Sequence, residues 1–67
     1  MNWDQIAGNW KQVTGKVKEK WGKLTDDDLT TITGKRDQLA ASIQKYYGIA
    51  KEQAEKDADV FAKTLSK

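Results

Sequence analysis

Lysines and glycines are interleaved in the segment "GNWKQVTGKVKEKWGK", which occupies residues 8–23. On a helix, Gly8 and Gly15 lie opposite the apolar residues, and each glycine costs about 1 kcal/mol relative to alanine. Exposed backbone bordered by ammonium groups can receive a phosphate backbone or a partner helix. The segment therefore predicts a contact surface made of Gly8, Lys11, Gly15, Lys16, Lys18 and Lys23.

The same segment also has a purely structural interpretation. Lysines usually cover a solvated face, and a helix that contains two glycines can bend or fray. Lysine binds phosphate as a point charge, whereas arginine, which binds it bidentately, occurs only at Arg36. Trp10 and Trp21 can stack on bases, but both lie on the apolar stripe, where a small domain needs large core side chains. We expect both tryptophans in the core and leave both interpretations of the lysines open.

The chain lacks two residue types that are common in catalytic and metal sites. There is no histidine and no cysteine, so the common transition-metal sites and the usual Ser-His or Cys-His pairs cannot form. Asp26, Asp27 and Asp28 are consecutive, whereas calcium loops place their ligands at alternate positions, so these aspartates fit helix capping better. We therefore expect a protein that is not an enzyme, with no catalytic residue, no metal site and no cofactor.

Composition limits the size and class of the protein. Its 67 residues suffice for one small domain, which we assign to residues 1–67, and a mean hydropathy of -0.85 is near the polar limit for a folded chain. The net charge of +2 does not by itself imply a nucleic-acid partner. No segment approaches the roughly 20 apolar residues that span a bilayer, and the N-terminus lacks a secretory pattern. We expect a cytoplasmic monomer without stable membrane insertion.

Apolar residues recur at spacings of three and four, which predicts an all-α fold of about four short helices. The first helix begins near Trp3, with Asn2 and Gln5 as a capping box. It ends near Trp21, because Gly22 suits the left-handed position after a helix.

The other predicted helices follow the same kind of local pattern. The second helix runs from Asp26 to Thr33 behind the capping pair of Thr25 and Asp28. The third begins after Gly34 and ends at Gly48, and its two tyrosines are expected as one core residue and one half-exposed neighbour. The fourth begins weakly, because Ala50 occupies its capping position, and carries Ala54, Ala58, Phe61 and Leu65 on one face.

A shift of 26 residues aligns the chain with itself. The aligned pairs are Gly8 and Gly34, Gln12 and Gln38, Val13 and Leu39, Val17 and Ile43, Trp21 and Tyr47, and Gly22 and Gly48. The alignment is either a structural repeat or a chance likeness between amphipathic helices. Because neither half can bury its apolar stripe alone, we predict two helical hairpins packed against each other.

The segment "GNWKQVTGKVKEKWGKLTDDDL" resembles the CsbD-like family of small bacterial stress proteins. The resemblance continues through "GKRDQL", "YYG" and "KEQAEKDADVF", so it covers nearly the whole chain. It implies a compact all-α fold, similar to a sterile-alpha-motif-like arrangement, in a protein made during general stress. It also implies no established reaction, so the shared residues are family markers without assigned roles.

Three main hypotheses for the function remain at this point. The first is a non-enzymatic stress-response protein that binds or protects other macromolecules, with a protein or a nucleic acid as partner. The second is a weak nucleic-acid binder that uses Lys11, Lys16, Lys18 and Lys23. The third is a partly ordered hydrophilic protectant, against which the tryptophans and the strong periodicity argue. A weaker fourth is action at a membrane surface through the first helix, which has a basic border and tryptophans, but exposing that stripe to lipid would remove the core of the domain.

Overall fold

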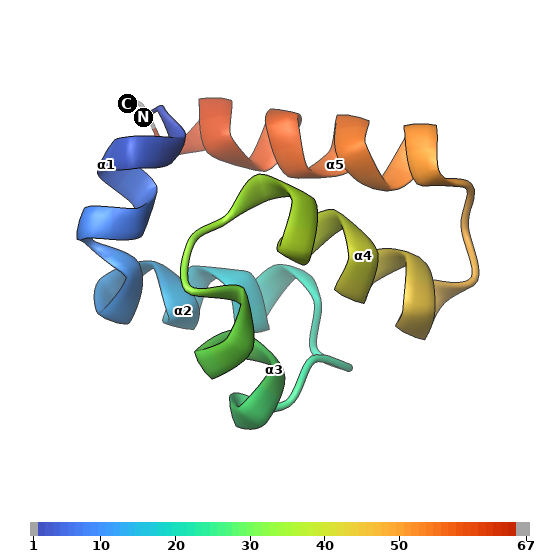
Figure 1. The fold of residues 1–67 in the computed structure, drawn as a ribbon, viewed down its shortest axis with the longest axis horizontal. Coiled ribbons are helices and arrows are strands. Elements are labelled where there is room, and N and C mark those ends of the chain that lie inside the picture. Colours follow the sequence, from blue (N-terminus) through green and yellow to red (C-terminus); the bar gives the residue numbers. More distant parts are fainter. Residues whose placement is uncertain (1, 66–67) are drawn as a thin grey trace.

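Residues 2–65, the part of the chain that the computed structural model describes, form five α-helices and no strand. The helices are α1 (Trp3–Gly8), α2 (Trp10–Lys20), α3 (Asp26–Ile32), α4 (Arg36–Tyr47) and α5 (Lys51–Thr64). In Figure 1, α4 and α5 lie side by side in opposite directions, and α3 packs against α4. The prediction of an all-α fold is confirmed. None of the described helices is long and apolar enough to cross a membrane.

The first predicted helix, over residues 3–21, is in fact two helices. α1 begins with the predicted capping box, in which the Asn2 side chain accepts from the Gln5 N–H at 2.8 Å and the Gln5 side chain accepts from the Asn2 N–H at 3.1 Å. α1 ends at Gly8, and the Asn9 side chain donates to the Gln5 carbonyl at 3.0 Å. Glycine and asparagine are poor helix formers, and this amide gives a terminal carbonyl a second donor, so the chain turns before α2 (Figure 1).

α2 ends as predicted, but without a left-handed glycine. Trp21 leaves the helix with φ -125° and ψ 76°, and within residues 2–65 positive φ occurs only at Thr33, Gly34 and Gly48. The prediction that Gly22 is left-handed is therefore wrong. The chain leaves α2 in a different way because the Trp21 side chain is buried in the core, where its ring meets the Phe61 ring edge-on at a centroid distance of 5.1 Å.

The start of α3 confirms the second predicted capping box. The Asp28 N–H donates to the Thr25 hydroxyl at 3.2 Å, and the Thr25 N–H donates to the Asp28 carboxylate at 3.0 Å. The three aspartates of the first turn also lie at the positive end of the helix dipole. Capping therefore accounts for this acidic cluster, and among residues 2–65 no group of acidic side chains is placed to hold a metal ion.

The turn between α3 and α4 fits closely against α1. Thr33 and Gly34 have φ values of 48° and 82°, so two successive residues are left-handed. Gly34 is buried, and a Cβ atom at this position would lie 2.5 Å from the Cα of Ala7. Only glycine permits this approach, so Gly34 allows α1 to pack on the turn.

The hairpin of α4 and α5 makes the most extensive helix contact in the fold. Gly48 ends α4 in the left-handed conformation, with φ 65°, and Ala50 begins α5 without a side-chain cap, as predicted. Three buried alanines of α5, which are Ala54, Ala58 and Ala62, permit a close approach between the two helices.

Arg36 joins α4 to α5. Its Nε and Nη2 atoms donate to the two carboxylate oxygens of Asp59 at 2.6 and 2.8 Å, and its Nη1 atom lies 3.5 Å from a Glu55 oxygen. Trp3 of α1 also acts on the Asp59 carboxylate. The hydrogen bonds from Arg36, and then its charge, lower the pKa of Asp59, to which Trp3 adds a smaller effect, while the hydrogen bonds to Asp59 raise the pKa of Arg36. This cluster connects the first helix with the last.

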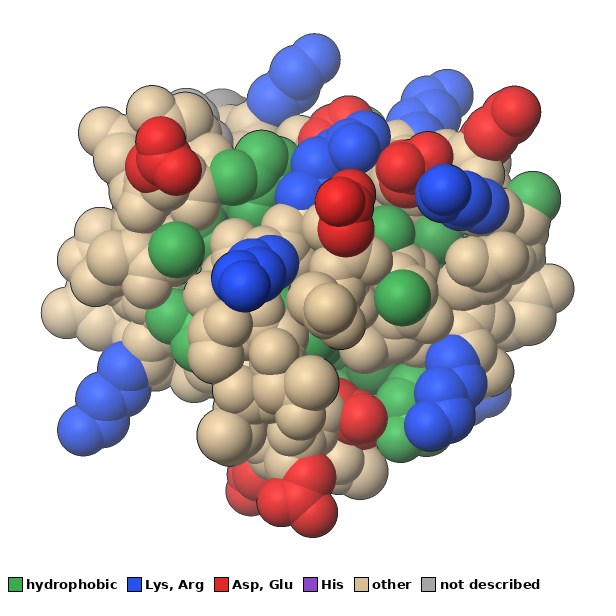
Figure 2. All heavy atoms as spheres, viewed as in Figure 1, with side chains coloured by type: hydrophobic (Ala, Val, Ile, Leu, Met, Phe, Trp, Pro, Cys, Tyr) green, Lys and Arg blue, Asp and Glu red, His purple; other side chains and the backbone are tan. Residues whose placement is uncertain are grey.

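The core is formed entirely by apolar side chains. Its buried residues come from all five helices and from the loop after α2. They are Ile6, Val13, Val17, Trp21, Leu24, Leu29, Ile32, Leu39, Ala40, Ile43, Ala54, Ala58, Phe61 and Ala62. Within residues 2–65 no polar or charged side chain is buried. Figure 2 shows acidic and basic side chains spread over one face of the molecule, with hydrophobic atoms visible between them.

Candidate functional site

The predicted contact residues lie on three separate segments. Gly8 ends α1, Lys23 lies in the loop between α2 and α3, and the other four residues lie on α2. All six are exposed, and no side chain would meet a Cβ atom within 4 Å at Gly8 or Gly15. Because the helix is interrupted at Asn9, the two glycines do not share one continuous helix face. The contact surface that the sequence predicts from these six residues therefore stays a prediction.

Four residues of α2, namely Lys11, Gly15, Lys16 and Lys18, form what we call the α2 outer surface. Two of its three lysines are close to carboxylates. Lys18 Nζ lies 2.6 Å from an Asp26 oxygen, and Lys16 Nζ lies 3.9 Å from a Glu19 oxygen. These neighbours offset part of the positive charge that the sequence places on α2.

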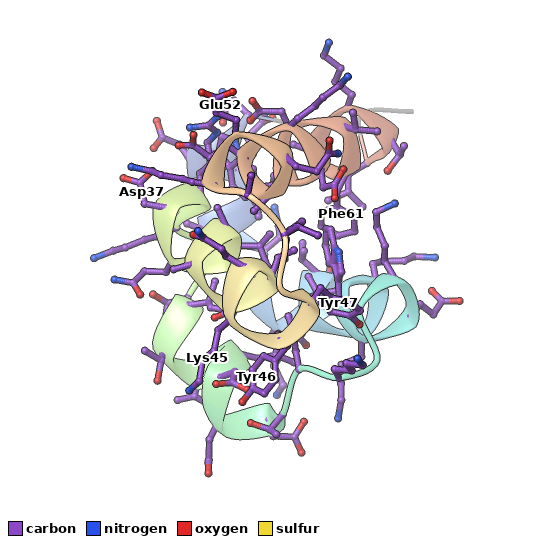
Figure 3. All side chains as sticks on the ribbon, turned by 90° about the vertical axis from the view of Figure 1, so that its right-hand side faces the viewer. Asp37, Lys45, Tyr46, Tyr47, Glu52 and Phe61 are labelled. Atoms are coloured by element: carbon purple, nitrogen blue, oxygen red, sulfur yellow. The ribbon has the colours of Figure 1, made fainter. Side chains whose placement is uncertain are left out.

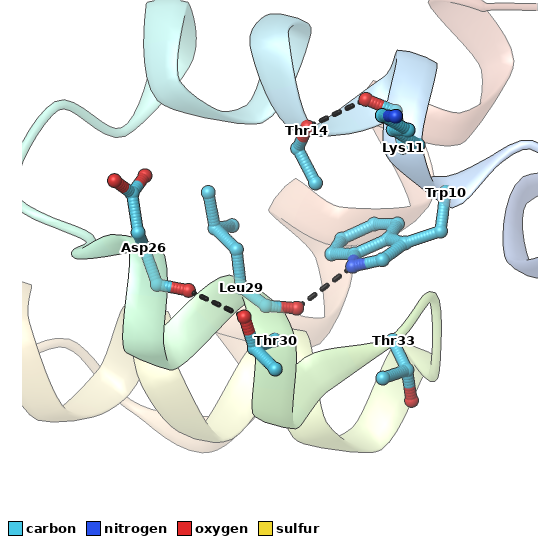
Figure 4. Close-up of a pocket in the computed structure, with 7 residues that line it drawn as sticks. All are labelled: Trp10, Lys11, Thr14, Asp26, Leu29, Thr30 and Thr33. Carbon is cyan, nitrogen blue, oxygen red and sulfur yellow. Dashed lines mark hydrogen bonds between the residues drawn. The ribbon is translucent and has the colours of Figure 1, made fainter.

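A groove of about 370 Å³ separates α2 from α3 (Figure 4). The indole N–H of Trp10 points across it and donates to the Leu29 carbonyl at 2.7 Å. Trp10 packs against the core but is only half-buried, whereas Trp21 is buried as predicted. The indole is thus already hydrogen-bonded, and its main role is to hold α2 beside α3.

A second lysine-bearing region lies where the end of α4 meets the loop after α2 (Figure 3). We call it the aromatic end, and it consists of Trp21, Tyr46 and Tyr47 with Lys20, Lys23 and Lys45. Each lysine lies over one ring: Lys20 over Trp21 at 5.5 Å, Lys23 over Tyr47 at 5.0 Å and Lys45 over Tyr46 at 5.4 Å, measured from Nζ to the ring centroid. Both tyrosines are half-buried, so the prediction that one of them is a core residue is wrong. Both stay near the surface because their hydroxyls bond polar groups of neighbouring segments.

The two tyrosine hydroxyls of the aromatic end fix α4 to the segment before α3. Tyr47 accepts a hydrogen bond from the Lys23 N–H at 3.3 Å. Tyr46 donates to the Asp28 carboxylate, which lowers the pKa of Asp28 together with the bonds from Thr25 and the charge of Lys45. The same bond raises the pKa of Tyr46. Both rings are therefore held in place.

The sequence interpretation missed Lys20, Lys45 and the role of the tyrosine pair. The repeat in the sequence could have indicated the position of Tyr47, because the shift of 26 residues aligns Trp21 with Tyr47. In the structure both side chains line one groove of about 300 Å³, together with Lys20, Ile43, Ile49 and Asp57. The aligned pair therefore meets in space.

Comparison with known proteins identifies the family. The CsbD-like family profile matches residues 4–56, which is most of the chain. The chain belongs to the CsbD-like family. The matched region of this CsbD-like chain contains the α2 outer surface and the whole aromatic end.

Curated relatives of the CsbD-like chain are close in sequence and in length. UPF0337 protein YjbJ of Escherichia coli is 64% identical over 63 residues, which cover 94% of this chain and 91% of the relative. A UPF0337 protein of Pectobacterium atrosepticum is 68% identical over 57 residues, covering 85% of this chain and 83% of the relative. One from Protochlamydia amoebophila is 61% identical over 57 residues, covering 85% and 86%. Their names state no reaction, ligand or partner, so the likeness assigns a family and not an activity.

Proposed function

We propose that this CsbD-like chain is a non-enzymatic protein of the bacterial stress response, which acts by binding other macromolecules through its surface. One observation carries the proposal: among the described residues, no polar or charged side chain is buried. Catalytic acids and bases are usually found where burial shifts their pKa. Here the shifted groups are Asp28, Tyr46, Arg36 and Asp59, and each is engaged in a bond that joins helices or caps one.

The family and the apolar core support two further parts of this proposal. Membership of the CsbD-like family supports the role in stress. An apolar core that draws on all five helices supports a folded binding protein rather than a partly ordered protectant. The proposal includes a monomer that acts in the cytoplasm.

Nucleic-acid binding through the α2 outer surface and Lys23 has weaker support. Lys16 and Lys18 face carboxylates, whereas Lys23 forms no ion pair within residues 2–65 and lies over the Tyr47 ring, away from the α2 outer surface. A phosphate would compete with a carboxylate for the first two of these lysines. Any nucleic-acid hypothesis must therefore explain which lysines are available.

The proposal is tested in a bacterium that lacks its own CsbD-like gene. The chain should restore survival after heat or osmotic stress, and single carboxylate changes should leave that survival intact once folding is matched. The changes are Asp28→Asn, Glu55→Gln and Asp59→Asn, with helix content measured by circular dichroism. A folded variant that loses survival through one such change would indicate a catalytic carboxylate and contradict the proposal, as would failure of the wild type to restore survival.

A further inference from the structure

Lysine–aromatic contacts are concentrated at the aromatic end. Within residues 2–65, three lysine Nζ atoms lie 5.0–5.5 Å from the centroid of an aromatic ring, inside the range of about 6 Å at which an ammonium group is attracted to a ring face. They involve three different rings from α4 and from the loop after α2. These contacts bring three positive charges close to two half-buried tyrosine rings and the buried Trp21 where the end of α4 meets the loop after α2.

The three lysines of the aromatic end form no ion pair within residues 2–65, although the charge of Lys45 acts on Asp28. The ion pairs within residues 2–65 involve Lys16, Lys18 and Arg36, and none involves Lys20, Lys23 or Lys45. Two acids of this region are engaged elsewhere: Asp28 is bonded by Thr25 and Tyr46, and Asp57, which lines the groove with Lys20, accepts from Gln53 at 2.8 Å. The lysine ammonium groups are therefore available to a phosphate.

The two tyrosine rings are held in place by their hydroxyls, while the lysine on the face of each ring can be replaced by another group. Their hydroxyls are bonded to Asp28 and to the Lys23 backbone, so a ligand need not immobilise them. An exposed lysine–ring contact is weaker than the stacking of a nucleic-acid base on the same ring. A base can therefore displace the lysine from the ring, and the lysine can turn to the neighbouring phosphate.

We propose that the aromatic end binds single-stranded nucleic acid, with bases on Tyr46 and Tyr47 and phosphates on Lys20, Lys23 and Lys45 (Figure 3). This inference rests on the proposed function and names the class of its partner. The contact is independent of base sequence, because an aromatic ring stacks on any base. The groove beside Tyr47 gives the strand a shallow path between α4 and the loop after α2.

A membrane surface fits this region less well. Binding at a bilayer interface needs apolar side chains that protrude. The rings of the aromatic end are half-buried or buried, and among the described residues the exposed large hydrophobic side chain is Val60 of α5, at 45%. A flat base can reach a half-buried ring, whereas a lipid chain gains little from it.

The test compares two variants of equal charge. One replaces Lys20, Lys23 and Lys45 with alanine, and the control replaces Lys11, Lys16 and Lys18. Anisotropy of a labelled oligothymidine of about 12 nucleotides, a length within the usual range of single-strand sites, measures binding as salt is varied. Circular dichroism confirms that both variants fold.

The wild type should bind at low salt, with log K falling against log salt with a slope of about -2 for three phosphate contacts. The aromatic-end variant should lose at least tenfold in affinity and most of this slope, and the control should keep both. Equal losses in the two variants, no binding by the wild type, or binding to phosphatidylglycerol vesicles without binding to oligothymidine would overturn the inference. If oligothymidine fails to bind but survival is restored, only the nucleic-acid partner is wrong; if oligothymidine binds but survival is not restored, the stress function is wrong.

Discussion

The α2 outer surface and the aromatic end each carry three lysines, but their surroundings differ. On α2, Lys16 and Lys18 face carboxylates, and Gly15 leaves open space beside them. At the aromatic end, every lysine lies over a ring, and two of those rings bond a neighbouring segment. Lysine density along the sequence therefore does not locate a binding surface. The side chains that approach each lysine from other segments decide whether it is available.

Trp21→Ala should remove one ring of the aromatic end and have the largest effect on the free energy of unfolding. The indole is 5% exposed and packs edge-on against Phe61, so its removal leaves a cavity at the centre of the fold. We expect the free energy of unfolding to fall by about 3–5 kcal/mol, measured by urea unfolding followed through circular dichroism. A loss below about 0.5 kcal/mol would show that Trp21 is not a core residue, since that is the scale of surface changes.

Thr25→Ala should have a smaller but clear effect at the same end. Thr25 caps α3, and its hydroxyl accepts from the Asp28 N–H. Loss of such a cap costs about 1 kcal/mol, and urea unfolding measures it. Thr30→Ala is the control, because Thr30 is an exposed α3 residue whose hydroxyl only donates to the Asp26 carbonyl. Equal destabilisation by both changes would contradict the capping role.

Low pH should reduce the stability of the fold by protonating Asp28, which holds Tyr46 at the aromatic end. The pKa of Asp28 lies below its ordinary value of 3.8, chiefly because of the Tyr46 hydrogen bond. The ionised carboxylate therefore stabilises the fold above this ordinary value, and the stabilisation is lost as the pH falls through the folded-state pKa. Thermal unfolding of Asp28→Asn at a series of pH values should show a smaller acid-induced fall than that of the wild type. We attribute part of the acid-induced loss of thermal stability that Asp28→Asn still shows to Asp59, whose pKa is also lowered.

Gly15→Ala should stabilise the protein, in contrast to changes at the aromatic end. Gly15 is exposed inside α2, and no side chain lies within 4 Å of its Cβ position. Alanine is the better helix former, so urea unfolding should show a gain of up to about 1 kcal/mol. Gly34→Ala is the opposite control, because its Cβ would lie 2.5 Å from the Ala7 backbone at a positive φ. A loss of stability in Gly15→Ala would indicate a contact on this surface.

Lys18→Ala should have the smallest effect. The Lys18 and Asp26 side chains are 47% and 85% exposed, and exposed ion pairs contribute little. The expected change in the free energy of unfolding is below about 0.5 kcal/mol, and it should shrink further in salt. A larger loss that persists in salt would mean that the α2 outer surface stabilises the fold.

Local interactions of the fold could be predicted from the sequence. The capping boxes of Asn2 with Gln5 and of Thr25 with Asp28 each span three residues, so a short segment contains all their atoms. The end of α4 at Gly48 is local in the same way. The break at Asn9 was harder to predict, because the apolar stripe continues through it and glycine only lowers helix propensity.

Contacts between distant segments could not be predicted in the same way. The approach of Gly34 to Ala7 and the pairing of Arg36 with Asp59 depend on how the helices pack. The same holds for the candidate site, since Lys23 and Tyr47 are 24 residues apart and meet only after folding. A helical wheel shows which lysines of one helix are exposed, but it does not show which aromatic rings from other segments contact them.

The central claim is that the aromatic end, rather than the α2 outer surface, is the binding surface. Titration of the ¹⁵N-labelled protein with oligothymidine at low salt, followed by amide chemical shifts, tests this claim most directly. We predict that the largest shifts occur over residues 20–25 and 45–49, with small shifts over 11–18. Shifts centred on 11–18, or the absence of shifts at low salt, would contradict it.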